Sequence, residues 1–454
     1  MRPAFFNAGA AAFFSAALLI SVPGVAQVNL IRDHFERAKS FDPTYIAAIA
    51  GRDAAQKATE VAEAMLGPKV SLSGTVFRTN RIEESRNIFG QASDVSRRFD
   101  TQNATIQARQ PIYRKRESLG VDQAMAQESA AENILLFAEQ DLQARLVNTW
   151  LEVLSARTLV TTFIDAYLAS QEYLAEIDRR RQGGEATIQD LEQARARVMQ
   201  AEALIEDAKA RLLIADQALT LIAGPDQKVP PGVTMAFFSS LPVAFKSEAE
   251  VIDKVERSNY EIISAKFQEE AAKLERDKAR SDRLPTADAF ASVTKGQNDS
   301  LNFIKDEQRF GIQLSVPLYT HGAIDASIAQ ADASYRKFQA QSKATAFRAR
   351  NEALSAFNNL RALELRLKAS DRIAEAAGTV LKAQRLGLKA GVSSRGEIAQ
   401  SMSEMLAAHR ERVLVRREYA VTWLKLQASA GALDLSLLEA LQASLITTQS
   451  PERR

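Results

Sequence analysis

The sequence contains two copies of one long pattern, and this duplication restricts the fold more than any other feature. Each copy begins with a Pro-x-Tyr sequence, continues through a long stretch without proline, and ends in a glycine turn. Gly184 follows Pro111 by 73 residues, and Gly391 follows Pro317 by 74 residues. Two long helices of nearly equal length would give a rod or a tube, so the pattern predicts an elongated, internally duplicated protein.

Composition and charge exclude several classes of function. With 46 % hydrophobic residues, 12 prolines and 19 glycines, the 454-residue chain is typical of a folded protein. Its net charge of +2, with both signs interspersed, provides no basic stripe for nucleic acid. The chain has no cysteine, and its histidines, His34, His321 and His409, lack metal-ligand spacing. Because phosphate-binding and dinucleotide motifs are also missing, the sequence predicts neither an enzyme nor a metal or cofactor site.

The amino-terminal segment is typical of a secretory signal peptide. An apolar run from Ala8 to Ile20 follows Arg2 and precedes a small-residue sequence that ends at Ala26. The run is too short to span a bilayer as a helix, which needs about 20 residues. The alternative is an uncleaved first helix that is amphipathic or buried. We expect residues 1–26 to be a signal peptide, and we expect no transmembrane helix in the mature chain.

Proline positions divide the rest of the chain, because a proline inside a helix removes a hydrogen bond and clashes with the preceding turn. The first repeat, residues 27–226, is expected to contain, in chain order, a helix at 30–66, a strand at 70–76, a loop at 81–96, a strand at 98–110, a long helix at 114–181 and a helix at 188–222. Val70, Leu72 and Val76 alternate with polar residues, which predicts a strand with one apolar face.

The second repeat, residues 248–433, follows a proline-rich linker at 227–247 and has the same order of elements. Its expected elements are a helix at 248–283, a strand at 285–293, a loop at 294–307, a strand at 310–316, a long helix at 324–388 and a helix at 396–429. Residues 434–454 are expected to form a polar carboxy-terminal tail.

The four expected strands have the length of tilted strands that cross a bilayer, about ten residues. Four strands cannot close a barrel, and small membrane barrels begin at about eight strands. Several copies would therefore have to combine their strands, and the long helices would continue the barrel as a tube. The alternatives are a soluble helical rod with two hairpins and an exported coiled-coil scaffold or interaction protein without a pore.

The order of elements, the paired Pro-x-Tyr sequences and the glycine turns resemble the TolC family of outer-membrane channels. The resemblance covers residues 29–433 and is carried best by RRQGGEATIQDLEQARA at 180–196 and LGLKAGVSSRGEIAQ at 386–400. The sequence FDPTYIAAIAGRDAA at 41–55 resembles the opening helix of the family's secretion branch. The resemblance implies a mainly α fold with a transmembrane β-barrel. In it an internally duplicated protomer forms a trimeric 12-stranded β-barrel continued by a 12-helix periplasmic α-barrel.

The same resemblance implies a function and a set of partners. The protein would be the outer-membrane exit duct of a tripartite export system in a Gram-negative bacterium, with its helical part in the periplasm. Its partners would be two sister copies in a homotrimer, a periplasmic adaptor (membrane fusion) protein, an inner-membrane ABC or proton-driven transporter, and outer-membrane lipid. Type I protein secretion is favoured, and drug efflux through the same fold is the alternative.

The resemblance also assigns roles to the two helix-turn-helix tips. It implies that the tips close the periplasmic end of the tunnel and dock the adaptor, at the matching positions Arg180, Gly184, Thr187, Gly391 and Ser394. Thr187 and Ser394 each precede an acidic residue by three positions, which is the spacing of a helix capping box. Capping alone would explain these residues without a channel, and both roles can coexist.

A pore constriction is implied at Glu397, Gln400 and Asp190. Three copies of Glu397 around an axis would form a ring of like charges that favours cations. The sequence departs from the family here, because Gln400 stands where a second acid is common and Arg395 replaces an apolar residue. Leu388 and Ser393 likewise stand where some members have a tyrosine and an arginine, so the contacts that lock the tips are open.

Four residues mark the corners between strands and long helices, and they are Pro111, Tyr113, Pro317 and Tyr319. Tyrosine rings with a polar end are favoured at the interface between membrane and water. The corner tyrosines are therefore candidates for the membrane interface, and ordinary packing at the corner is the alternative. The prolines are expected to help bend the strands into the helices.

Overall fold

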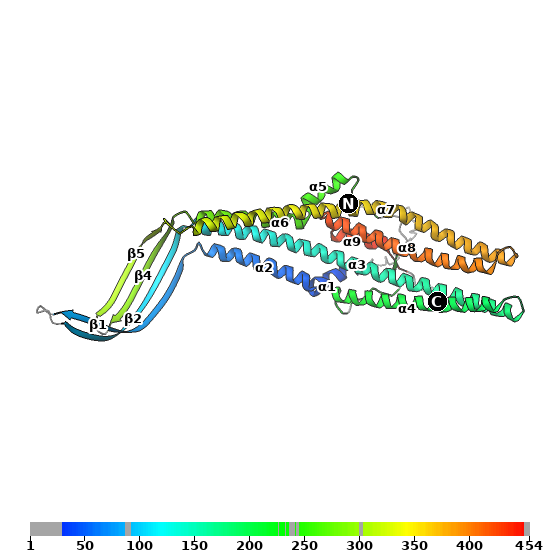
Figure 1. The fold of residues 1–454 in the computed structure, drawn as a ribbon, viewed down its shortest axis with the longest axis horizontal. Coiled ribbons are helices and arrows are strands. Elements are labelled where there is room, and N and C mark those ends of the chain that lie inside the picture. The colour runs from blue at the N-terminus through cyan, green and yellow to red at the C-terminus, as the bar shows by residue number, and fades with distance from the viewer. Residues whose placement is uncertain are drawn as a thin grey trace, which may run out of the picture.

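The computed structural model describes residues 30–86, 92–225, 227–231, 233–235, 241, 245–298 and 303–448. The described chain forms a long rod with a curved sheet at one end and helices along the rest (Figure 1). Both tight helix turns lie at the end opposite the sheet. The expected signal peptide, residues 1–26, lies outside the described residues.

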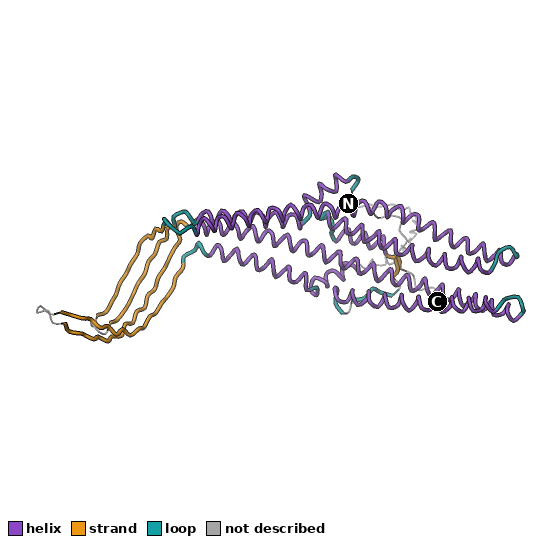
Figure 2. Tube along the Cα trace, in the orientation of Figure 1, coloured by secondary structure: helices purple, strands orange, loops and turns teal. Residues whose placement is uncertain are grey.

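The sheet has four antiparallel strands in the order β1-β2-β4-β5. Figure 2 shows the strands in orange at one end of the rod. They are β1 (Lys69–Arg86), β2 (Ala92–Tyr113), β4 (Thr286–Asn298) and β5 (Phe303–Ser315). All four expected strands are confirmed, but much of the expected loops at 81–96 and 294–307 is strand. Alternation of apolar residues marked only part of each strand, because the ladder is made by backbone groups and continues where the alternation ends.

One face of the sheet is apolar and exposed. Strand register aligns Leu72 with Ile106 and Ile106 with Val293, so apolar residues form rows across the strands. In a second row, Ala291 of β4 pairs with Phe310 of β5, whose side chain is 89 % exposed. Large exposed apolar patches are unusual on a monomer in water and mark a surface that contacts lipid or protein.

The helices of the first repeat are α1 (Leu30–Phe41), α2 (Pro43–Ala64), α3 (Lys115–Gln182) and α4 (Ile188–Ala223). The long helix and the helix that follows it are confirmed. The single helix expected at 30–66 is wrong, because Asp42 ends α1 and its side chain accepts a hydrogen bond from the N–H of Tyr45 at 2.9 Å. Pro43 fits the first position of α2, where its missing N–H has no cost.

The second repeat contains α5 (Glu248–Ser258), α6 (Tyr260–Ser281), α7 (Ala323–Lys389) and α8 (Arg395–Ser429). A single helix expected at 248–283 is again two helices. The side-chain oxygen of Asn259 accepts from the N–H of Ile262 at 3.0 Å, and its nitrogen donates to the carbonyl oxygen of Ser429 at 2.8 Å. Asn259 therefore caps the start of α6 and holds the end of α8 against it.

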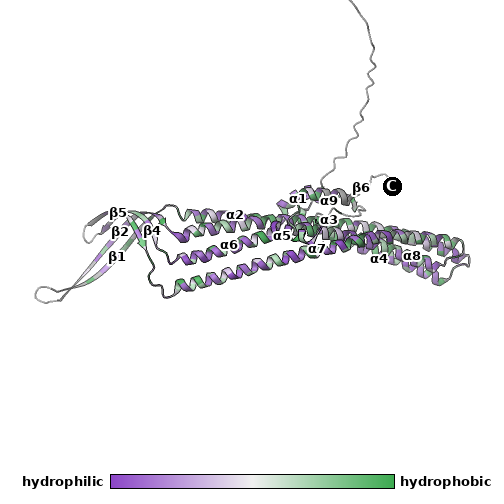
Figure 3. Ribbon diagram, turned by 90° about the horizontal axis from the view of Figure 1, so that it is seen from above, coloured by the Kyte–Doolittle hydropathy of each residue, from purple (hydrophilic) through white to green (hydrophobic). Residues whose placement is uncertain are grey.

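The helices form a layer that is one helix thick along much of the rod. Helix α3 contacts α2 and α4 and also α6 and α8, and α6 and α8 both contact α7. Helices α2 and α7 lie at opposite margins of the layer in both Figure 1 and Figure 3. Among the described helices, none combines the length and the apolar character that crossing a lipid bilayer requires.

The largest apolar core lies where the two repeats meet. It includes Trp150 of α3 and Trp423 of α8, both 1 % exposed. The expected polar tail is wrong over residues 435–448, which form α9 (Leu435–Leu445) and the short strand β6 (Ile446–Thr448). Leu438 and Leu441 of α9 lie in this core at helical spacing. The helix was missed because the segment is short and follows a glycine. Strand β6 pairs with β3 (Val233–Met235) of the linker between repeats.

Candidate functional site

The first tip is a tight turn between α3 and α4. Gly184 has a φ of 79°, a left-handed conformation that favours glycine. The hydroxyl of Thr187 accepts from the N–H of Asp190 at 3.2 Å, and the Asp190 carboxylate accepts from the N–H of Thr187 at 2.9 Å. This reciprocal capping box satisfies free amides at the start of α4. The N–H of Glu185 also donates to the carbonyl oxygen of Arg180 at 2.8 Å, which closes the turn.

The second tip, between α7 and α8, repeats this geometry. Gly391 has a φ of 78°. Glu397 accepts from the N–H of Ser394 at 2.8 Å, and Ser394 accepts from the N–H of Glu397 at 3.2 Å. The N–H of Val392 donates to the carbonyl oxygen of Gly387 at 2.9 Å. Capping boxes predicted from the sequence are therefore present at both tips, whatever further role these residues have.

Arg395 connects the two tips. Its guanidinium donates to the carbonyl oxygen of Glu185 at 2.7 Å and lies 3.5 Å from the Asp190 carboxylate. The backbone oxygen of Arg395 accepts from the Tyr173 hydroxyl at 3.5 Å. The Arg395 and Asp190 side chains are only 23 % and 29 % exposed, so water screens their attraction less than at an open surface. These contacts hold α8 against the first tip.

The capping geometry also sets the ionisation of Asp190. The backbone N–H of Thr187, its hydroxyl and the nearby Arg395 guanidinium all stabilise the carboxylate, and together they lower the pKa of Asp190 from its ordinary 3.8. Asp190 is therefore charged at neutral pH and can pair with Arg395. Sequence reasoning found Asp190 as a cap and noted Arg395 only as a departure from the family pattern. No local signal pairs residues that are more than two hundred positions apart.

A second polar contact joins α4 and α8 above the tips. The guanidinium of Arg197 donates to the carbonyl oxygen of Ala399 at 2.6 Å. Next to it, the first tip contains a small buried apolar cluster of Ile177, Leu191 and Ala194. No sequence signal selects Arg197, because an arginine on a charged helix is ordinarily solvated.

The remaining tip residues predicted from the sequence lie on the surface. Glu397 and Gln400 are exposed, and the Gln400 amide donates to Glu404 of its own helix at 2.8 Å. Arg180 pairs with Glu176 of its own helix at 2.7 Å. Within one copy of the chain these side chains do not converge on one another, and a constriction built from Glu397, Gln400 and Asp190 stays a prediction.

The corner residues lie where the sheet meets the helices. Strand β2 passes through Pro111 and ends at Tyr113, with a register shift between them. Next to this shift, the Asp288 carboxylate of β4 pairs with the Arg114 guanidinium at 2.7 Å. Tyr319 lies outside β5, and its side chain is 82 % exposed. Pro317 and Leu318, which precede it, are exposed as well. A membrane-interface role for Tyr113 and Tyr319 stays a prediction.

Comparison with known proteins gives consistent results over nearly the whole chain. The model of the family described as "outer membrane efflux protein" matches residues 36–225 and 251–432. The chain is 26 % identical to proteases secretion protein PrtF of Dickeya chrysanthemi over 418 residues, 90 % of each chain. It is 25 % identical to outer membrane protein TolC of Vibrio cholerae over 432 residues, 93 % of this chain and 95 % of that one.

Solved structures show the same fold. A membrane protein from Pseudomonas aeruginosa superposes with a TM-score of 0.78 at 19 % identity, covering 88 % of this chain and 93 % of the other. The outer membrane protein VceC of Vibrio cholerae superposes with a TM-score of 0.73 at 18 % identity, covering 88 % and 96 %. The two segments matched by the family model contain the two long helices and their tips, α3–α4 and α7–α8.

Proposed function

The chain belongs to the outer membrane efflux protein family, and we propose that it is the outer-membrane exit duct of a tripartite system that exports protein. Members of this family are channel components of the outer membrane and not enzymes. The observation that carries the proposal is the sheet with one exposed apolar face, joined directly to a helical layer far longer than the sheet. Such a molecule can connect a membrane to a distant partner.

Both layers of the molecule have open edges, and we propose that two further copies cover them. In the described sheet, β1 and β5 are edge strands, each paired on one side only. In the helical layer, the margins are α2 and α4 on one side and α7 on the other. Unlike edges that meet head to tail generate a closed ring. Three copies would give the closed sheet that a membrane requires, with no free strand edge in lipid.

Apolar residues on the margins fit this arrangement. Leu365, Ile373 and Val380 of α7 are exposed at steps of eight and seven residues. Helix α4 exposes Leu213 and Leu221 at a step of eight. Spacing near seven keeps side chains on one face of a helix, as in coiled coils. Each margin therefore presents an apolar stripe that a neighbouring copy can bury.

The two helix pairs also carry opposite charge. Residues 361–417, in α7 and α8, include 12 Lys and Arg and 6 Asp and Glu, a net charge of +6. Residues 152–211, in α3 and α4, include 8 Lys and Arg and 11 Asp and Glu, a net charge of −3. In a ring the pairs would alternate, so each basic pair would lie between two acidic pairs. This alternation favours a head-to-tail ring over a contact between like edges.

We place the gate at the tips. The Arg395 contacts hold α8 against the first tip, and their release would let the two helix pairs separate. Adaptor contact at Arg180, Gly184, Thr187, Gly391 and Ser394 would drive that release. Glu397, Gln400 and Asp190 would face the axis there, and the Glu397 carboxylates of the three copies would attract cations.

Protein secretion is the favoured cargo route, and drug efflux is the second candidate. Two relatives of this chain are named for the secretion of proteases. One is PrtF of Dickeya chrysanthemi, and the other is AprF of Pseudomonas aeruginosa, which is 22 % identical to this chain over 448 residues. An adaptor and an ABC transporter of the inner membrane would then be the partners. Crosslinking in whole cells followed by purification tests this, with a transporter of the ABC class as the expected partner and a proton-driven pump as the result that would favour efflux.

Conductance tests the duct itself. The protein should require detergent for extraction from membranes. After purification it should have the size of a trimer and form ion-conducting pores in planar bilayers. Glu397→Ala should weaken block of that conductance by divalent cations. Glu192→Ala is the matched control, because Glu192 is an exposed acid of the other tip that pairs with Arg195 of its own helix at 2.7 Å. A salt-extracted monomer without conductance would contradict the proposal.

A further inference from the structure

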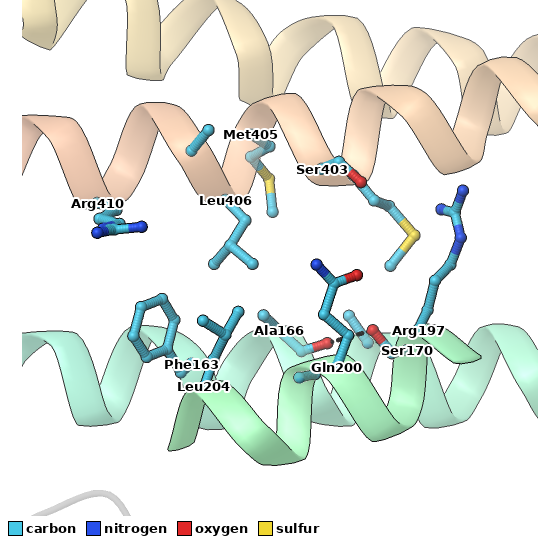
Figure 4. A pocket seen from close by; sticks show the side chains of 14 residues that line it. Phe163, Ala166, Ser170, Arg197, Gln200, Leu204, Ser403, Met405, Leu406 and Arg410 are labelled. Atoms are coloured by element: carbon cyan, nitrogen blue, oxygen red, sulfur yellow. Dashed lines mark hydrogen bonds between the residues drawn. The ribbon is translucent and has the colours of Figure 1, made fainter. Parts of the chain in front are cut away.

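Apolar packing between the two helix pairs is interrupted above the tips. One buried cluster joins α3, α4 and α8, and its members are Leu159, Phe163, Ile205, Ala208 and Val413. The separate tip cluster of Ile177, Leu191 and Ala194 lies farther along α3 and α4. Between them, a cavity of about 230 Å³ lies between α8 and the pair α3 and α4 (Figure 4). The gap exists because small side chains line it, among them Ala166, Ser170, Ala201, Ser403 and Ala407.

The lining is apolar at its centre and cationic at its ends. Figure 4 shows Phe163 of α3 and Leu406 of α8 on opposite sides of the gap, with Arg410 at one end and Arg197 at the other. Arg197 bonds to the carbonyl oxygen of Ala399. Among the described residues, no carboxylate forms an ion pair with either arginine, and no acidic residue lines the cavity. Arg410 is exposed to solvent and Arg197 bonds to a carbonyl oxygen, so either guanidinium can still pair with the anionic group of a ligand.

We propose that this cavity binds a small amphiphilic carboxylate, with one ring or a short alkyl chain and a single anionic group. The cavity is open to solvent along Ser403, Ala407 and Arg410. Its volume exceeds the about 150 Å³ that holds benzene in an enclosed apolar cavity, so it has room for a ring with a short chain. The carboxylate would pair with Arg410, because a guanidinium fork matches a carboxylate in geometry. Met402 and Met405 line the same cavity, and their flexible thioethers can adapt to the shape of the ligand.

Binding there would hold the helix pairs together. The ligand would contact α8 on one side and α3 and α4 on the other, so it would fill the gap while Arg410 of α8 holds its carboxylate. A ligand that binds one arrangement of a protein better than another shifts the population toward that arrangement. Binding in the cavity would therefore favour the arrangement in which Arg395 contacts Glu185 and Asp190. The binding site itself does not depend on conduction or on the identity of the cargo.

Isothermal titration calorimetry on the full chain in a nonionic detergent tests the site. The probe is 4-phenylbutyrate, and 4-phenylbutanol and 4-phenylbutylamine are its neutral and cationic counterparts. We expect saturable binding of the carboxylate, at least fivefold weaker binding of the alcohol, and none of the amine. Arg410→Gln should weaken carboxylate binding at least fivefold. Arg195→Gln, an exposed α4 arginine paired with Glu192, should leave it unchanged.

A second variant separates the cavity from the charge. Ser403 is exposed at its rim, so Ser403→Leu should fold normally while it narrows the gap, and it should lower the affinity at least fivefold. Equal carboxylate binding by wild type and Arg410→Gln would overturn the proposal. Binding of the amine as tight as that of the carboxylate would also overturn it, because it would indicate partition into detergent. Loss of conductance alone would leave this binding result intact.

Discussion

The Arg395 guanidinium donates a hydrogen bond of 2.7 Å to the carbonyl oxygen of Glu185, although 210 residues separate the two in the chain. The same guanidinium lies 3.5 Å from Asp190. Glu185 lies in the turn after α3 and Asp190 in the first turn of α4, and Arg395 is the first residue of α8. One side chain thus joins the two copies of the duplicated pattern at the end of the rod that lies farthest from the sheet.

Replacing Arg395 should favour separation of the tips. Arg395→Gln keeps a similar length but loses the charge and the forked donor, so we expect a loss of about 1 kcal/mol, the size of a partly exposed ion pair. That change corresponds to about a fivefold increase in the ratio of open to closed channels, measured by single-channel recording in planar bilayers. Arg181→Gln is the control, because Arg181 pairs with Asp178 of its own helix. Equal open probability for the Arg395→Gln and Arg181→Gln channels would contradict a role of Arg395 in gating.

The Asp190 contact should survive mild acid. Its pKa is lowered in the folded protein, so its contribution to stability is complete above the ordinary pKa of 3.8 and is lost as pH falls through the lowered value. We expect the distance between spin labels at Gln189→Cys and Val392→Cys to stay constant from pH 7 to about pH 5 and to broaden only in stronger acid. Asp190→Asn should show the broader distribution at every pH. A transition near neutral pH in the wild type would contradict this assignment.

Gly431 should tolerate no side chain. It has a φ of 63°, and a Cβ atom there would overlap the carbonyl oxygen of Ser258, where the end of α8 approaches the end of α5. Gly431→Ala should lower the free energy of unfolding by about 2 kcal/mol or more, from left-handed strain and the clash.

Gly378→Ala is the matched control for Gly431→Ala. Gly378 lies inside α7 with open space around it, so an added methyl group meets nothing within 4 Å. Alanine is the better helix former, and the variant should be more stable by about 0.5–1 kcal/mol. Thermal unfolding followed by circular dichroism should therefore move in opposite directions for the two variants. A parallel shift would show that local geometry does not decide either effect.

Asn259→Asp should weaken the joint between α8 and α6. Aspartate can still accept from the N–H of Ile262, but it cannot donate to the Ser429 carbonyl oxygen, and it places two acceptors side by side. We expect the free energy of unfolding to fall by about 1–2 kcal/mol. Asn133→Asp should have a smaller effect, because the Asn133 amide bonds to Ser129 of its own helix and not to a second helix among the described residues. Thermal unfolding of both variants under the same conditions measures the difference.

Local chemistry made much of the fold predictable. Absence of proline predicted α3 and α7 to within one residue at each end, and the capping boxes at Thr187 and Ser394 predicted the starts of α4 and α8. Each of these signals acts within a few residues, so tertiary context does not change it. The breaks at Asp42 and Asn259 were missed although both residues are good caps, because continuous helical periodicity on both sides concealed them.

Short-range patterns were enough to establish the duplication, the two long helices, the tight turns and the alternating strands, because hydrogen bonding and side-chain period act over short stretches of chain. Tertiary structure alone decided that Arg395 reaches Glu185, that Asn259 joins two helices end to end, and that small residues from three helices leave a cavity between two arginines. Those features depend on how helices distant in sequence pack together. That packing is set by shape across the whole layer, which no window of residues contains.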